Sequence, residues 1–113
     1  MAVSAAPYAR VFPSATVLAH HGGFGTCAEA LRAGKPSLVT PFAFDQFDTA
    51  ARVHDAGWGR RLVGKPDSSR DIAANLGFLL RSAPIGAAAR EAGAKIAALP
   101  DGADRAAELI EAL

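Results

Sequence analysis

Short apolar runs recur along the first half of the chain, and each is bounded by glycine, proline or polar residues. Runs of this length, rich in valine, leucine and threonine, are typical of buried strands. Three segments fit, the third most weakly: TVLAH (16–20), SLVT (37–40) and WGRRLV (58–63).

Between and after these runs the apolar positions recur at helical spacing. Helices are predicted over residues 25–33 and 46–56 between the strands, and over 68–82, 86–98 and 103–112 after them. The helix over 68–82 opens with Ser68 and Asp71 at the spacing of a capping box. Residues 1–13 are predicted to be irregular, because Pro7 and Pro13 block regular structure.

Alternation of strand and helix predicts an α/β fold, a parallel sheet of about three strands with flanking helices. We interpret residues 1–113 as a single domain with a core over 16–62 and helices over 68–113. In such sheets ligands bind at the carboxyl ends of the strands. The loops over 20–26 and 41–46 both follow strands, so we expect them to face one crevice.

Composition excludes several classes of function. A net charge of +1 gives no basic field suited to nucleic acid. The single cysteine, Cys27, cannot form an internal disulfide, which fits a reducing compartment; we interpret it as a packing residue. No run approaches the length of a membrane span, and residues 1–15 lack a secretory leader. We therefore expect a cytoplasmic protein.

The segment AHHGGFGTCAEALRAGKP (19–36) carries the candidate chemistry. A helix that begins directly after Gly22, Gly23 and Gly25 presents unpaired N–H groups and the positive end of its dipole, with no side chains to keep a phosphate away. Thr26 and His21 can add donors, and a carboxylate at Glu29 can accept from the diol of a ribose. Phosphate and sugar together indicate a nucleotide.

Other interpretations of the segment are weaker. A plain tight turn between strand and helix would explain the glycines alone. Gly23-x-Gly25-x-x-Ala28 matches the dinucleotide fingerprint, but Asp45 does not directly end a strand as that motif requires. No Gly-Lys-Ser/Thr follows, which excludes a Walker loop. Zinc binding is disfavoured because neighbours in a strand, His20 and His21, point to opposite faces, and we expect one of the two to be structural.

Taken together, HHGGFGTCAEALRAGKPSLVTPFAFDQFDTAARV resembles the donor-binding segment of GT-B nucleotide-sugar glycosyltransferases. The similarity is strongest to the antibiotic- and rhamnolipid-type enzymes and to UDP-glycosyltransferases. It runs from about Pro7 to Leu62, and its motif, His-x-Gly…Glu…Gly-x-Pro…Pro-x-x-x-Asp-Gln, is long and specific. The resemblance implies a Rossmann-like sheet that forms the C-terminal half of a donor domain.

The resemblance also implies roles for individual residues. His21, eight residues before Glu29, would contact the pyrophosphate, and the loop from Gly23 through Thr26 would complete the phosphate cradle. Glu29 would hold the ribose hydroxyls. Asp45 and Gln46 would bind the transferred sugar, or act as a helix cap, or both. The donor-binding residues implied are His21, Gly23, Phe24, Gly25, Thr26, Glu29, Asp45 and Gln46. The role of Phe24 is open, and His20 has no counterpart duty.

The implied reaction is transfer of a hexosyl group from a UDP- or dTDP-sugar to a small-molecule or lipid acceptor, without metal or cofactor. The resemblance places the general base in an N-terminal domain outside this chain, so no catalytic residue is assigned here. We expect a fragment that is inactive alone and that self-associates or melts weakly. The alternatives are a non-catalytic donor-binding subunit that pairs with a separate acceptor chain, a degenerate protein and, remotely, an NAD-binding Rossmann domain.

Overall fold

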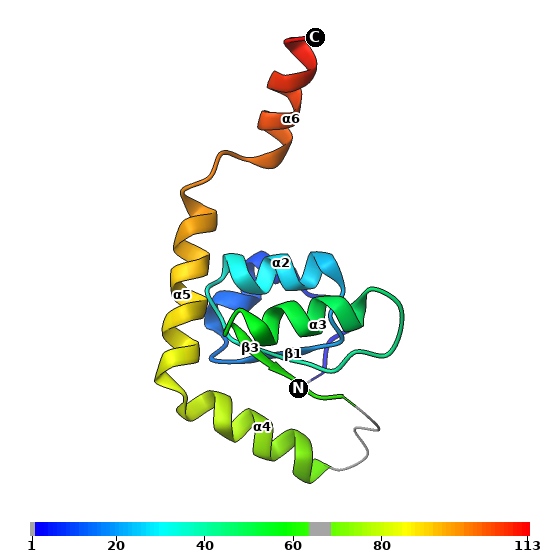
Figure 1. Cartoon of the computed structure of the whole chain (residues 1–113), viewed down its shortest axis with the longest axis vertical. Helices are drawn as coiled ribbons and strands as arrows, with labels where there is room; N and C mark the ends of the chain where they lie inside the picture. The colour runs from blue at the N-terminus through cyan, green and yellow to red at the C-terminus, as the bar shows by residue number, and fades with distance from the viewer. Residues whose placement is uncertain (1, 64–68) are drawn as a thin grey trace.

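Three parallel strands with helices on both faces make up the body of the protein in a computed structural model, which describes residues 2–63 and 69–113 (Figure 1). The strands are β1 (Leu18–His20), β2 (Ser37–Val39) and β3 (Gly59–Arg61), and they pair in the order β1-β2-β3. Leu18 lies opposite Ser37, and Ser37 lies opposite Gly59. The predicted α/β fold is confirmed, with strands shorter than the apolar runs that indicated them.

Each strand is connected to the next by a helix on the same face of the sheet. The helix α2 (Phe24–Arg32) joins β1 to β2, and α3 (Gln46–Asp55) joins β2 to β3. These two helices lie side by side above the sheet in Figure 1. Parallel strands joined in this way bring their carboxyl ends to one edge, where the loops after β1 and β2 begin.

The second half of the chain is helical, as predicted. The helix α4 (Ser69–Arg81) packs against β2 and β3 on the opposite face from α2 and α3 (Figure 1). The helix α5 (Ala83–Ala97) starts three residues earlier than predicted, because the Ser82 hydroxyl accepts from the N–H of Ile85 and caps it. The helix α6 (Gly102–Glu111) follows. Ser68, predicted to cap α4, lies outside the described residues.

The prediction that residues 1–13 are irregular is wrong. A short helix α1 (Tyr8–Val11) is followed by a 3₁₀ turn η1 (Phe12–Ser14). Both prolines start these turns instead of blocking them, Pro7 as the N-cap of α1 and Pro13 in the first turn of η1. A proline lacks an N–H, and the first turn of a helix does not need one. The Tyr8 ring stacks on buried Phe12 with 4.5 Å between centroids.

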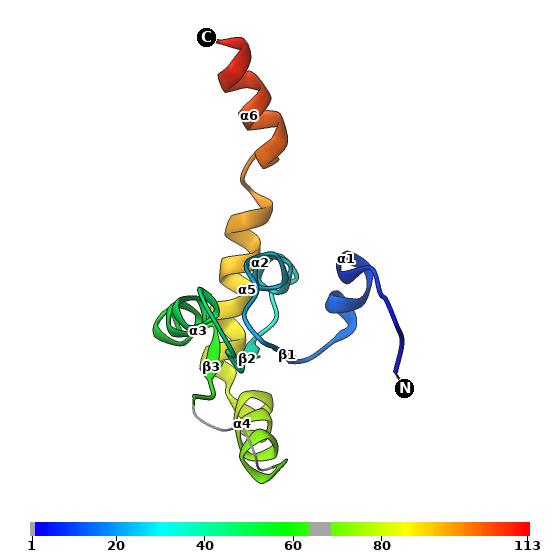
Figure 2. The same cartoon turned by 90° about the vertical axis from the view of Figure 1, so that its right-hand side faces the viewer.

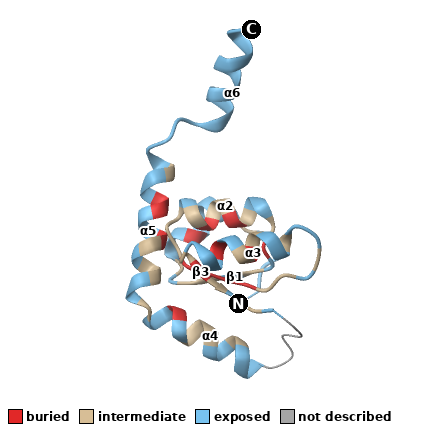
Figure 3. Ribbon diagram, viewed as in Figure 1, coloured by how far each residue is buried: buried red, intermediate tan, exposed pale blue. Residues whose placement is uncertain are grey.

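The core lies between the sheet and the helices. The buried cluster above the sheet combines α2, β2 and α3 through Cys27, Val39, Ala50 and Val53, with Leu31 and Trp58 packed around it. Leu38 precedes Val39 in β2 and points to the other face, toward the α4 side, and both are fully buried. Figure 3 shows buried residues on α2, α3, α4 and α5 and none on α6, and α5 is packed against α2.

The C-terminal helix stands apart from this core. Figure 2 shows α6 beyond the end of α5, and Figure 3 shows it exposed along its whole length. Leu109, Ile110 and Leu113 are among the exposed apolar residues at this end of the chain, as expected for a helix with little to pack against. Among the described residues no single helix is long and apolar enough to span a membrane; α4 with the segment through α5 and α6 meets that test only as a pair bent by 73°.

Candidate functional site: the loop between β1 and α2

The start of α2 is an open helix end. Its N-cap is Gly23, and no side chain accepts a hydrogen bond there. The N–H of Cys27 donates to Gly23 O at 3.0 Å. The three amides before it, those of Phe24, Gly25 and Thr26, belong to the first turn and have no carbonyl one turn earlier to donate to. Apart from its chain neighbours and the backbone of its own helix, nothing lies within 4 Å of the point where a Cβ on Gly25 would stand. These amides can therefore donate to an approaching anion.

Gly22 sets the shape of the loop. Its φ is +94°, a conformation that L side chains rarely adopt. A Cβ there would lie 2.9 Å from Val39 Cγ1 and 3.1 Å from the carbonyl oxygen of Gln46. Gly22 thus lets the loop after β1 pack directly on the first residue of α3. The loops over 20–26 and 41–46, which we expect to face one crevice, are in contact at this point.

His21 and Thr26 flank the open helix end. A Cβ placed on Gly23 would lie 3.6 Å from His21 Cε1 and 4.0 Å from Thr26 Oγ1. The imidazole is exposed, and the threonine is half-buried. The structure therefore gathers a ring N–H, a hydroxyl and the first-turn amides around Gly23. All of these groups can donate hydrogen bonds, as a phosphate requires.

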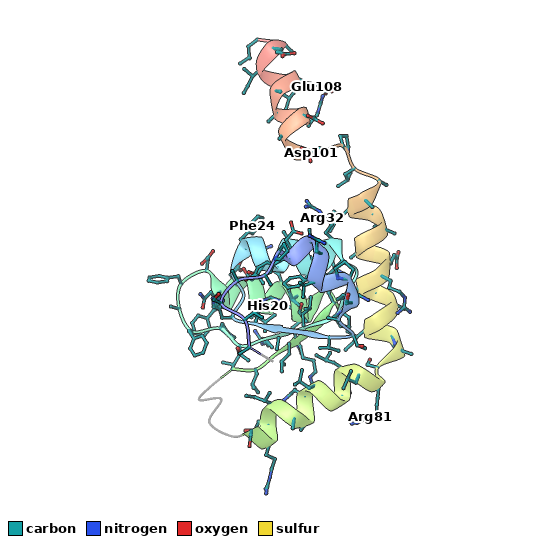
Figure 4. The ribbon with its side chains drawn as sticks, turned by 180° about the vertical axis from the view of Figure 1, so that it is seen from behind. His20, Phe24, Arg32, Arg81, Asp101 and Glu108 are labelled. Carbon is teal, nitrogen blue, oxygen red and sulfur yellow. The ribbon has the colours of Figure 1, made fainter. Side chains whose placement is uncertain are left out.

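His20 is the structural histidine of the pair. Its Nδ1 accepts from the N–H of Gly22 at 3.1 Å, and its Nε2 lies 3.0 Å from the Oγ of buried Ser37 on β2. Burial, and next the neighbouring His21, lowers the pKa of His20 to about 4. The ring is therefore neutral at physiological pH. Figure 4 labels His20 at the end of β1.

The loop before α3 is held by the side chain of Gln46. Its Oε1 accepts from the N–H groups of Phe42 at 2.9 Å and Ala43 at 3.1 Å. Phe44, between them and the helix, has a φ of +55°, which is uncommon for a residue with a side chain. With Gln46 Oε1 engaged by the backbone, its amide nitrogen is the part that can donate to a ligand.

Asp45 occupies the N-cap position of α3, but its side chain makes no capping hydrogen bond. Asp45 therefore stands where a helix cap was expected, but its carboxylate does not cap the helix. Asp45 and Phe24 come together at a largely apolar cavity of about 380 Å³ between α2 and α3, which Cys27 and Trp58 also line. Phe24 is 79% exposed at the start of α2 (Figure 4).

Glu29 lies on a different side of α2 from this cavity. Its Oε1 accepts from Arg32 Nη1 at 2.9 Å, and both residues line a small cavity of about 90 Å³ against Ala9 and Pro13. The resemblance implies that the Glu29 carboxylate holds the ribose hydroxyls. The structure instead pairs it with an exposed arginine, and a ribose hydroxyl would have to compete with that ion pair.

Ser37 is a residue of this site that the sequence analysis missed. It appears in the sequence as the polar first residue of a predicted strand, in register with Leu18 and not with His20. Nothing in the spacing of residues 20 and 37 indicates that their side chains meet. The pairing of β1 with β2 creates the contact.

Comparison with known proteins gives the family. Residues 1–112 match the family described as erythromycin biosynthesis protein CIII-like, C-terminal domain. Elloramycin glycosyltransferase of Streptomyces olivaceus is 41% identical over 103 residues, which cover 91% of this chain and 25% of that protein. Sterol 3-beta-glucosyltransferase of Aspergillus oryzae is 47% identical over 57 residues, or 50% of this chain and 4% of that protein.

Solved structures share the fold. Spinosyn rhamnosyltransferase aligns with a TM-score of 0.84 at 30% identity, over 96% of this chain and 30% of its own length. Its complex with thymidine diphosphate aligns with a TM-score of 0.83 at 29% identity, over 92% of this chain and 29% of its own. The glycotransferase of kitacinnamycin aligns with a TM-score of 0.82 at 30% identity, over 93% of this chain and 27% of its own.

This chain spans less than a third of the length of each of these relatives. The match over residues 1–112 and the shared α/β fold place the chain in a known class. It belongs to the family of the erythromycin biosynthesis protein CIII-like C-terminal domain, the C-terminal part of GT-B glycosyltransferases.

Proposed function

We propose that this chain binds the nucleoside diphosphate of a nucleotide-sugar donor at the loop 21–26. The observation that carries the proposal is the open start of α2, where first-turn amides, the His21 ring and the Thr26 hydroxyl surround Gly23. Hydrogen-bond donors and the positive end of a helix dipole suit a diphosphate. That the related spinosyn enzyme has been solved with thymidine diphosphate supports dTDP as the first ligand to test.

The same donors suit the chemistry of sugar transfer. As the bond to the sugar breaks, negative charge grows on the diphosphate that leaves. Fixed amides and the His21 ring around Gly23 would stabilise that charge, and an interaction that strengthens with the developing charge lowers the barrier. We propose that the chain supplies this part of a hexosyl transfer to a small-molecule or lipid acceptor, in the cytoplasm, and that a further domain supplies the general base.

Asp45 and Gln46 are proposed to read the transferred sugar, and Glu29 the ribose. The first assignment is supported by the packing of Gly22 against Gln46, which puts the start of α3 beside the diphosphate loop. Asp45 makes no capping hydrogen bond, so its carboxylate can accept from sugar hydroxyls. Glu29 needs Arg32 to move aside or to share the ligand.

Titration of the ¹⁵N-labelled chain with dTDP, UDP and NAD tests the proposal. We expect dTDP or UDP to shift the amides of Gly23, Gly25 and Thr26, and NAD to leave them in place. His21→Ala should weaken the binding of the nucleoside diphosphate. The control is His54→Ala, which replaces an exposed histidine on α3 and should leave that binding unchanged. Shifts confined to residues elsewhere in the chain would contradict the assignment.

The division between ribose and sugar needs a second titration. Glu29→Ala should weaken the binding of dTDP and of a dTDP-sugar by similar factors, because both ligands carry the pentose. Asp45→Ala should weaken the binding of the dTDP-sugar and leave the affinity for dTDP unchanged. Equal losses of dTDP affinity in the two variants would show that the roles are assigned wrongly.

A further inference from the structure

His20 lies at the end of β1, next to the proposed diphosphate loop, and the donor chemistry gives it no role. Both of its ring nitrogens are nevertheless engaged. Nδ1 accepts from the N–H of Gly22 at 3.1 Å, and Nε2 lies 3.0 Å from Ser37 Oγ on the neighbouring strand. The ring therefore bridges the central strand of the sheet to the first glycine of the loop.

These contacts fix one tautomer. A neutral imidazole has one donor nitrogen and one acceptor nitrogen. The backbone N–H of Gly22 can only donate, so Nδ1 must be the acceptor, and Nε2 carries the proton that it donates to Ser37. A ring protonated at both nitrogens would turn Nδ1 into a second donor facing the Gly22 N–H.

The bond to Gly22 matters because glycine has the widest backbone freedom of any residue. The Gly22 N–H belongs to the peptide that joins it to His21, so holding that N–H orients the residue that carries the exposed ring. On its other side Gly22 packs against Val39 Cγ1 and the backbone of Gln46. The residue is thus held from three directions: by the His20 ring, by β2 and by the start of α3.

We propose that His20, held by Ser37, is a positioning residue that fixes the Gly22 peptide and so aims His21 and the first amides of α2. The claim that these groups face a diphosphate rests on the proposed function. The positioning itself does not, and it can be measured on the free chain.

Two substitutions separate the two ends of the ring. The asparagine side chain in His20→Asn carries an oxygen on Cγ, where histidine carries Nδ1, so this variant can still accept from Gly22 while it loses Ser37. His20→Gln places its amide one atom further out, near the position of Nε2, and leaves the Gly22 N–H without its acceptor. His54→Asn, on the exposed side of α3, is the matched control.

The first experiment uses NMR without any nucleotide. We expect the ring nitrogens of His20 at pH 7 to show a protonated Nε2 and a bare Nδ1. His20→Gln should displace the amides of Gly22, Gly23 and Thr26, whereas His20→Asn and His54→Asn should leave them close to their wild-type positions. A proton on Nδ1, or equal displacement by His20→Asn and His20→Gln, would overturn the proposal.

The second experiment measures the Kd of dTDP together with the thermal transition of each variant. We expect His20→Gln to raise Kd by roughly tenfold and His20→Asn by less than about threefold, with both still folded. If His20→Gln does not fold, Ser37→Ala replaces it, because it frees the ring from β2 and should raise Kd by a smaller factor. Equal rises in Kd for His20→Gln and His20→Asn would overturn the proposal, and so would no rise for Ser37→Ala where it stands in for His20→Gln. A wild-type chain that binds neither dTDP nor UDP would refute the proposed function, and the NMR comparison would still decide the positioning role.

Discussion

Gly93 on α5 approaches the end of α2 so closely that a Cβ on it would stand 2.9 Å from Gly34 Cα and 2.8 Å from the carbonyl oxygen of Leu31. Both of these atoms belong to the backbone and cannot swing aside. Gly93 is buried, and α5 packs against α2. The position of α5 against the body of the protein therefore depends on the absence of a side chain at Gly93.

We expect Gly93→Ala to destabilise the protein by about 1–3 kcal/mol, as overpacking of a buried contact does. Alanine by itself favours a helix over glycine by about 1 kcal/mol, so the clash must exceed this gain. Urea unfolding followed by circular dichroism measures the difference. Gly102→Ala is the control, because a Cβ there would meet nothing within 4 Å beyond its own helix and chain neighbours. Equal or higher stability of Gly93→Ala would show that α5 can move away from α2 at little cost.

The loop before α3 should loosen when Gln46 is shortened. Gln46→Ala leaves the N–H groups of Phe42 and Ala43 without the acceptor that now holds them, so their hydrogen exchange should become faster. Gln46→Glu keeps an acceptor oxygen and should keep the loop, while it loses the amide that can donate to a sugar. We expect Gln46→Glu to bind dTDP as the wild type does and a dTDP-sugar more weakly. Unchanged exchange in Gln46→Ala would contradict the holding role.

Stability should fall as the pH drops below neutrality because of His20. Its pKa is about 4 in the folded protein and about 6.5 in an unfolded chain. Between pH 6.5 and pH 4 the unfolded chain therefore binds a proton at this ring and the folded chain does not. The contribution is complete above about pH 6.5 and is lost progressively toward pH 4. We expect roughly 1–2 kcal/mol, less than the whole shift implies, because the ring is only partly buried.

The measurement is the free energy of unfolding at pH 7 and pH 5, for the wild type and for His20→Asn. Asparagine cannot titrate but can still accept from Gly22, so the loss of stability on acidification should be smaller in the variant. The carboxylates are common to both proteins, and their titration cancels in the comparison. The same loss in both would mean that His20 is not the titrating group.

Removal of residues 102–113 should change the stability of the remaining chain by no more than about 0.5 kcal/mol, because every residue of α6 is exposed. It should, however, reduce self-association, since Leu109, Ile110 and Leu113 leave an apolar strip open to solvent. Light scattering and thermal unfolding measure the two effects. Ile110→Glu in the chain of residues 1–113 is the matched variant for association. A large loss of stability on truncation would show that α6 packs on the body in solution.

The alternation of apolar runs with helical spacing was enough to predict the α/β fold, because each period reports which face of an element is buried. It was less informative about ends. The predicted strand begins at Thr16, yet β1 begins at Leu18. A pattern of apolar residues reports which residues are buried. The length of a strand also depends on where the neighbouring strand, with which it pairs, begins.

The candidate site was predictable where its chemistry lies in the backbone. Glycines before a helix indicate open amides whatever the surroundings, and the structure has them at Phe24, Gly25 and Thr26. Side-chain partners were harder to predict. Glu29 forms an ion pair with Arg32, and the His20 ring lies within hydrogen-bond distance of Ser37. Such partners depend on which part of the fold lies next to each side chain. A contact between residues 20 and 37 exists only once two strands have paired.

The order of the strands in the sheet is also their order along the chain. Leu18 pairs with Ser37 and Ser37 with Gly59, so each pairing joins segments that are close in sequence. Each pairing is parallel, however, and must close a loop that contains a whole helix before its hydrogen bonds form, which makes such pairing slow. The helices α2 and α3 have local contacts and can therefore form before the strands pair, whereas the loop between β1 and α2 takes its final shape only when Ser37 and Val39 of β2 lie beside it.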